Sequence, residues 1–121
     1  MKKVIKVDPM GKPRMVASDR WRKRPCVLRY WEFKAELLRL MAKSGIKASE
    51  ECLSISFYMA MPKSWAKKKK AKMLGQPHKQ KPDIDNLVKG FLDAVLEEDC
   101  TVWDISAKKF WAEEGRIEIY E

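Results

Sequence analysis

Two aspartates, Asp83 and Asp85, stand two residues apart in the stretch KPDIDNLVKGFLDAV, which runs from residue 81 to residue 95. An α-helix advances about 100° per residue, so side chains two apart on a helix point about 200° away from each other. The two carboxylates therefore converge only if Asp83 precedes the helix. Pro82 favours this, because it fixes its own φ and holds the preceding residue extended. We expect Asp83 on an extended entry and Asp85 as the helix N-cap.

The aspartate pair is compatible with two kinds of role. Asp is a preferred N-cap, stabilising by about 1 kcal/mol relative to Ala, and the helix dipole favours negative charge there. That role accounts for one aspartate, but not for two beside a lysine-rich segment. One or two carboxylates with phosphate oxygens and water also suit Mg²⁺, which can activate water and stabilise the leaving oxygen of a phosphodiester. The pair thus predicts a Mg²⁺ site, with Mn²⁺ as the alternative ion, beside the structural interpretation.

Further residues near the pair extend the metal hypothesis. The candidates for a third carboxylate are Asp93 within the helix and Glu98, Asp99 and Asp104 beyond it. Lys89 lies four residues after Asp85 and shares its helix face. An ion pair at this spacing contributes only about 0.2–0.5 kcal/mol. The alternative role for Lys89 is to stabilise the charge that develops on a reacting phosphate.

The charge of the chain predicts a polyanionic partner. It has 26 Lys and Arg against 17 Asp and Glu, a net charge of +9 and a pI near 9.5. Residues 63–81 contain eight lysines and no acid, whereas eleven of the seventeen acids fall at or after Asp83. Lys and Arg neutralise phosphates and release counterions, so nucleic acid is the first candidate partner. The predicted phosphate contacts are Arg14, Arg20, Arg22, Lys23, Arg24, Lys67, Lys68, Lys69, Lys70, Lys72, Lys79 and Lys81.

A membrane partner is not expected. The basic residues form no long amphipathic helix, and no segment has the length and apolarity of a membrane span. No apolar stretch follows the charged start of the chain, so we expect a cytoplasmic protein.

The single histidine, His78, lies in the basic stretch without ligand-spaced partners, so a phosphate contact or solvent exposure is expected. Trp21 and Trp65 are interleaved with the basic groups, where each could stack on an unpaired base or pack in the core. We expect Trp103, Phe110 and Trp111 in the core or at a dimer interface.

The pattern of apolar residues predicts the elements that position these groups. A chain of 121 residues with 45% hydrophobic residues fits one domain, residues 1–121. Alternation predicts a strand over 52–61, and steps of three and four predict helices over 26–43 and 85–96. The result is a mixed α/β (α+β) fold, a small mixed sheet with two main helices on one face. The other expected elements are a strand over 3–7, a short basic helix after Ser64 that ends at Gly75, and strands over 101–111 and 116–120 joined by a hairpin turn.

The motif KPDIDNLVKGFLDAV resembles the signature of the RusA family of Holliday-junction resolvases. The shared pattern is an aspartate, one apolar residue, Asp-Asn-Leu, a lysine four positions after the second aspartate, and Leu-Asp-Ala. The stretches MPKSWAKKKKAKMLGQPHKQ and EEGRIEIYE resemble the same family, and RWRKRPCVLRYW does so more loosely.

This resemblance implies a small homodimer that binds four-way DNA junctions and makes symmetric, Mg²⁺-dependent nicks. By position in the motif, Asp83 and Asp85 are the first two metal ligands, Lys89 the essential lysine and Asp99 the third aspartate.

Asp99 departs from the family pattern, because only Glu97 and Glu98 separate it from the predicted helix end. Three alternatives remain open: the helix ends early, Asp99 reaches a site across a dimer interface, or Asp104 replaces it.

We expect a structure-selective endodeoxyribonuclease that resolves four-way junctions. The rival hypotheses are a nuclease for flaps and other branched DNA, and a catalytically silent DNA-binding protein.

Overall fold

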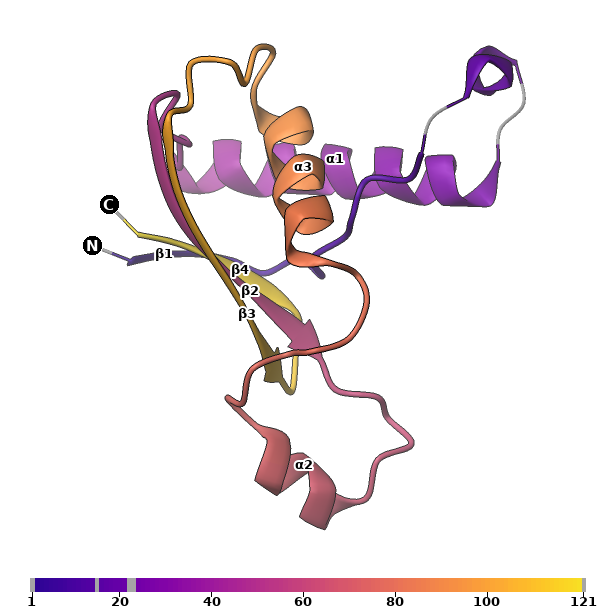
Figure 1. Cartoon of the computed structure of the whole chain (residues 1–121), viewed down its shortest axis with the longest axis vertical. Helices are drawn as coiled ribbons and strands as arrows, with labels where there is room; N and C mark the ends of the chain where they lie inside the picture. The colour runs from indigo at the N-terminus through magenta and orange to yellow at the C-terminus, as the bar shows by residue number, and fades with distance from the viewer. Residues whose placement is uncertain (1, 15, 22–23, 121) are drawn as a thin grey trace.

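The computed structural model describes residues 2–14, 16–21 and 24–120. Figure 1 shows helices α1 and α3 on one side of a twisted sheet, with the short helix α2 set apart at one end. The predicted mixed fold with two main helices is confirmed. The elements in chain order are β1 (Lys2–Ile5), the 3₁₀ helix η1 (Ala17–Arg20), α1 (Pro25–Ser44), β2 (Cys52–Ala60), α2 (Lys67–Met73), α3 (Ile84–Val95), β3 (Asp104–Ala112) and β4 (Arg116–Tyr120).

The sheet is mixed and has the strand order β1-β4-β2-β3. β2 pairs in parallel with β3, from Cys52 opposite Asp104 to Ala60 opposite Ala112. The other two pairings, β1 with β4 and β4 with β2, are antiparallel. Parallel neighbours need a crossover connection, and here residues 61–103 supply it. The helix that follows the aspartate pair is therefore part of the crossover.

The predicted hairpin between the last two strands is wrong. β3 and β4 lie on opposite edges of β2, so that Tyr58 of β2 is paired with Phe110 on one side and Arg116 on the other. The chain does reverse at residues 113–115, as the turn residues predicted. Alternation along a strand reports which side chains share a face, but not which strand lies next to it.

The core lies between the sheet and the two long helices. α3 buries one face through Leu87, Phe91 and Leu92, spaced as its apolar period predicted. Trp31 and Leu38 are apolar residues of α1 that are exposed instead of belonging to the core. The remaining members of the buried cluster are Ile5, Tyr30, Phe33, Leu37, Met41, Ile46, Leu53, Ile55, Phe57, Ala94, Ile117 and Ile119.

The segment after β1 crosses α3 at close range. A Cβ atom on Gly90 would lie 2.6 Å from the carbonyl oxygen of Met10, so only a glycine allows this approach. Tyr30 donates a hydrogen bond of 2.9 Å to the Gly90 carbonyl, and Lys12 contacts Asp93 at 2.6 Å. These contacts hold α3 against α1 and against the segment of residues 10–12. Within the described part of the chain, no helix has both the length and the apolarity needed to cross a bilayer.

Candidate functional site

Asp83 and Asp85 lie at the start of α3. Asp83 is the N-cap residue in an extended conformation, with φ −65° and ψ 150°, and Asp85 is in the first turn. The helix begins one residue earlier than predicted, so the expectation that Asp85 is the N-cap is wrong. The backbone carbonyl of Asp83 accepts the hydrogen bond of the Leu87 amide at 3.1 Å.

The Asp83 carboxylate makes no capping hydrogen bond, although it occupies the cap position. Both aspartate side chains are exposed, and both line one open hollow of about 510 Å³ with Lys81, Pro82 and Asn86. Two carboxylates facing a hollow open to water form a donor set of the kind that Mg²⁺ takes, since that ion retains several waters. The pair could therefore hold a hard divalent cation.

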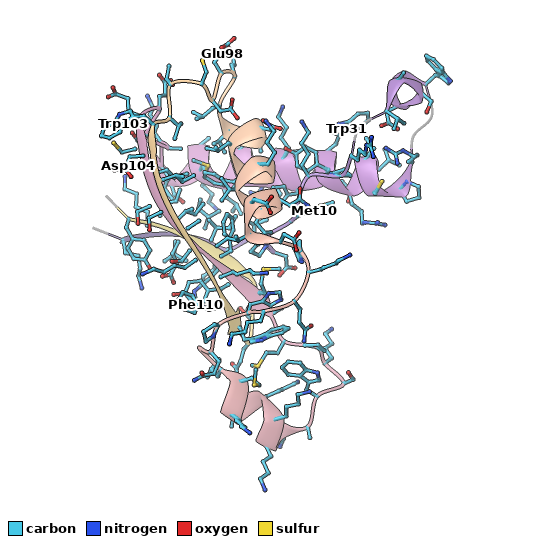
Figure 2. The ribbon with its side chains drawn as sticks, viewed as in Figure 1. Met10, Trp31, Glu98, Trp103, Asp104 and Phe110 are labelled. Atoms are coloured by element: carbon cyan, nitrogen blue, oxygen red, sulfur yellow. The ribbon has the colours of Figure 1, made fainter. Side chains whose placement is uncertain are left out.

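Among the described residues, the structure brings no third carboxylate of the same chain to the pair. α3 continues to Val95 and is about 18 Å long, so the alternative in which the helix ends early is wrong. Asp99 lies in the loop beyond its far end (Figure 1). Figure 2 shows Glu98 beyond the last turn of α3 and Asp104 at the start of β3. Among residues 2–14, 16–21 and 24–120, no group of three acidic, histidine or cysteine side chains could hold a metal ion.

Lys89 is ion-paired, but not with Asp85. Its ammonium lies 3.2 Å from Asp93 and 3.4 Å from Asp99. The hydrogen bond and charge of Asp93, followed by those of Asp99, raise the pKa of Lys89. Burial of Asp93 opposes its ionisation, yet hydrogen bonds from Lys12 and Lys89 lower its pKa. Asp93 is thus paired with two lysines. Lys89 bridges Asp93, in the last part of α3, and Asp99, in the loop that follows.

The lysines predicted to contact DNA gather on α2 and on the segment that leads to Asp83. Lys67, Lys68, Lys69 and Lys72 are exposed, and Lys70 is half-buried. Lys79 and Lys81 are also exposed, and Lys81 lines the same hollow as the two aspartates. The basic segment therefore leads directly to the carboxylate pair.

The second predicted basic group lies elsewhere. Figure 1 places η1 and α2 far apart, so the two groups do not form one patch. Arg24 makes two 2.8 Å hydrogen bonds to Asp19 and a third, of 2.7 Å, to the Arg14 carbonyl. The hydrogen bonds from Arg24 lower the pKa of Asp19 to about 2. The Arg24 side chain is therefore engaged by Asp19 and by the backbone of Arg14. Arg14 is exposed, Arg20 ends η1, and Arg22 and Lys23 lie outside the described residues.

His78 is buried, with 4% of its surface exposed, so the predicted phosphate contact or solvent exposure is wrong. Its ring centroid lies 4.2 Å from that of Trp111, which is in turn 4.8 Å from that of Trp65. Trp65 thus packs with buried aromatics, whereas Trp21 is exposed. Trp103 is 74% exposed and does not belong to the core of this chain. The ring that packs against His78 is that of Trp111 in β3, which lies more than thirty residues further along the chain.

Lys109 is a residue near the site that sequence reasoning did not identify. It lies in β3 and donates hydrogen bonds to the backbone carbonyls of Gln80 and Pro82. A lysine in a strand is typical of a solvated edge, and the sequence carries no signal for this contact.

The family model described as endodeoxyribonuclease RusA matches residues 6–120, a range that contains both aspartates, Lys89 and Asp99. The chain belongs to the RusA family. The resemblance noted in KPDIDNLVKGFLDAV is therefore confirmed. A curated relative, the uncharacterized protein YqaN of Bacillus subtilis (strain 168), is 36% identical over 75 residues, which are 55% of this chain and 53% of the relative. The chain thus spans about half the length of that relative.

Proposed function

We propose that this RusA-family protein is a divalent-metal-dependent endodeoxyribonuclease that resolves four-way DNA junctions by paired symmetric nicks. The observation that carries the proposal is the placement of Asp83 and Asp85. Both carboxylates are exposed, neither serves as a capping acceptor for α3, and both share a hollow with Lys81 beside the lysine-rich helix. Residues 1–121 would form one endonuclease domain.

Different residues of the chain would have different roles in phosphodiester hydrolysis. Asp83 and Asp85 would hold Mg²⁺, which when bound supplies an activated water and stabilises the leaving oxygen. Lys81 lies beside the pair and binds the phosphate that enters the hollow. The exposed lysines of α2 bind neighbouring phosphates and orient the strand.

The third carboxylate comes from Asp99 of a second copy of the chain. This part of the proposal is supported by the length of α3, which separates Asp99 from the pair within one chain. Lys89 contacts Asp99 at 3.4 Å, so the two side chains would reach the partner's site together. A two-fold homodimer would have two such sites, which suits the two equivalent phosphates of a junction.

The test combines binding with cleavage. The wild type and an Asp83→Asn, Asp85→Asn variant are incubated with a synthetic four-way junction, with Mg²⁺ and with chelator. We expect both proteins to bind and only the wild type with Mg²⁺ to cut. If the wild type binds but never cuts, the protein is a DNA-binding module and the proposal fails. Flap and duplex substrates run in parallel separate a junction resolvase from a nuclease for other branched DNA.

A further inference from the structure

The Lys109 side chain contacts the backbone of the segment that leads to Asp83. Its ammonium is 2.6 Å from the carbonyl oxygen of Gln80 and 2.8 Å from that of Pro82, and the side chain is half-buried. Pro82 is the residue immediately before Asp83. The two carbonyls therefore point at one ammonium group, which restrains the backbone on both sides of Lys81.

Backbone hydrogen bonds attach the earlier part of this segment to β3. Gly75 donates to the Trp111 carbonyl at 3.0 Å, Trp111 to Gln76 at 2.9 Å, and His78 to Lys109 at 3.0 Å. After His78 and before α3, the described residues make two hydrogen bonds to the sheet. The Lys109 ammonium donates both of them. The Lys109 side chain thus continues the attachment after the backbone pairing stops.

The contact determines where Asp83 sits relative to Asp85. Asp85 is held by the helix, but Asp83 is at the N-cap and takes its orientation from the preceding backbone. Hydrogen bonds from a charged donor are stronger than neutral ones, so two of them restrain this backbone effectively. Because a misplacement of about 1 Å can reduce a reaction rate by about 100-fold, such a restraint matters for a site built from a carboxylate pair.

We propose that Lys109 is a positioning residue, which holds the Gln80–Pro82 backbone so that the Asp83 carboxylate meets that of Asp85 around one divalent cation. The inference rests on the proposed function for its role in DNA cleavage. Its structural part concerns metal binding, and that part is measured without DNA.

Lys108 provides a matched control. It is the neighbouring residue in β3, it is exposed, and it lines a different hollow with Tyr58, Phe110 and Tyr120. Lys108→Met and Lys109→Met remove the same charge from adjacent positions. A difference between the two variants therefore reports the contact with the carbonyls rather than the loss of a positive charge near DNA.

The first measurement is Mn²⁺ binding, followed by electron paramagnetic resonance, for the wild type, Lys108→Met, Lys109→Met, Lys109→Arg and the Asp83→Asn, Asp85→Asn variant. We expect Lys109→Met to weaken Mn²⁺ binding by about 10-fold or more, and Lys108→Met to leave it unchanged. Lys109→Arg should restore most of the affinity, because its guanidinium can donate to both carbonyls. Equal Mn²⁺ binding by both Met variants would overturn the proposal.

Cleavage and junction binding are measured on the same proteins. We expect Lys109→Met to need a higher Mg²⁺ concentration for half-maximal cleavage, while its junction affinity matches that of Lys108→Met. A proportional loss of junction binding and cleavage would instead make Lys109 a phosphate contact. If circular dichroism shows that Lys109→Met is unfolded, Lys109→Arg is used in its place. Mn²⁺ binding by Lys109→Arg that is as weak as that of the aspartate variant then overturns the proposal. If the wild type binds Mn²⁺ but cuts no junction, the proposed function fails while the role of Lys109 stands or falls on the Mn²⁺ data.

Discussion

The Nζ atom of Lys89 lies 3.4 Å from Oδ2 of Asp99, so a lysine in the middle of α3 contacts the aspartate that we propose as the third metal ligand. The candidate site residues of this chain are therefore spread along α3 and into the loop that follows it. Asp83 and Asp85 lie at the start of the helix, and Lys89 joins its later turns to Asp99. Antiparallel placement of two such helices would bring these residues together, which leads to the first prediction.

An Asp83→Asn, Asp85→Asn variant and an Asp99→Asn variant should each lose junction cleavage by about 100-fold or more, because a metal ligand is removed. Mixed in equal amounts and allowed to exchange subunits, they should recover about a quarter of the wild-type sites. Half of the dimers are then mixed, and each has one complete site of two. The measurement is nicked strand per junction in a gel assay. Cleavage that stays at the level of the single variants would place the third ligand in the same chain.

The lysines of α2 should supply affinity for DNA without sequence preference. Replacing Lys67, Lys68, Lys69 and Lys70 by Gln should weaken junction binding, and should flatten its dependence on salt by about 0.9 in logarithmic slope for each phosphate that is no longer neutralised. The matched control replaces four exposed lysines elsewhere, Lys6, Lys34, Lys43 and Lys47. Fluorescence anisotropy over a salt series measures both slopes. Equal slopes in the two quadruple variants would show that the lysines of α2 do not contact the DNA.

Local patterns predicted the long elements well. The apolar steps of α3 and the alternation of β2 placed both within one residue of their observed bounds, since amphipathic periodicity depends on near neighbours in the chain. The signature that begins with Asp83 identified the family for the same reason. Its residues are contiguous, and their identity does not depend on what surrounds them.

Contacts between distant segments could not be predicted in this way. β3 and β4 were expected to pair, but β2 lies between them, and no property of residues 112–115 reports that insertion. His78 was expected at the surface, and Lys109 was given no role, because neither has a neighbour in the sequence that indicates its contacts. Their burial and their hydrogen bonds follow from the attachment of residues 75–78 to β3, a pairing across more than thirty residues. The same limit applies to Asp99, whose distance from the pair depends on where α3 ends.

The burial of His78 should make the stability of the protein depend on pH. Its buried ring, with a smaller contribution from the nearby Lys109 ammonium, lowers the pKa of His78 below the ordinary value. As the pH falls below about 6.5, the unfolded chain takes up a proton that the folded chain resists. The free energy of unfolding should therefore be greatest above this pH and decrease below it.

Urea denaturation between pH 7.5 and pH 5.5 measures the effect. The wild type should lose stability across this range, and His78→Phe should lose less, whatever its stability at neutral pH. The chain has a single histidine, so a residual slope in the variant reports groups other than histidine. Parallel curves for the two proteins would show that the His78 ring is protonated equally in the folded and unfolded chains.

The crossing of residues 10–12 over α3 should tolerate no side chain at Gly90. A Cβ there would lie 2.6 Å from the Met10 carbonyl oxygen and 3.0 Å from the Lys12 amide nitrogen, and both are backbone atoms. Gly90→Ala should cost about 1–3 kcal/mol of folding free energy through overpacking, although alanine is the better helix former by about 1 kcal/mol. Thermal unfolding measures the change. Lys89→Ala, at the adjacent exposed position of the same helix, serves as the control and should change stability far less. If Gly90→Ala were instead more stable than the wild type, the N-terminal segment could not lie against α3, and the contact of Lys12 with Asp93 would have to be absent as well.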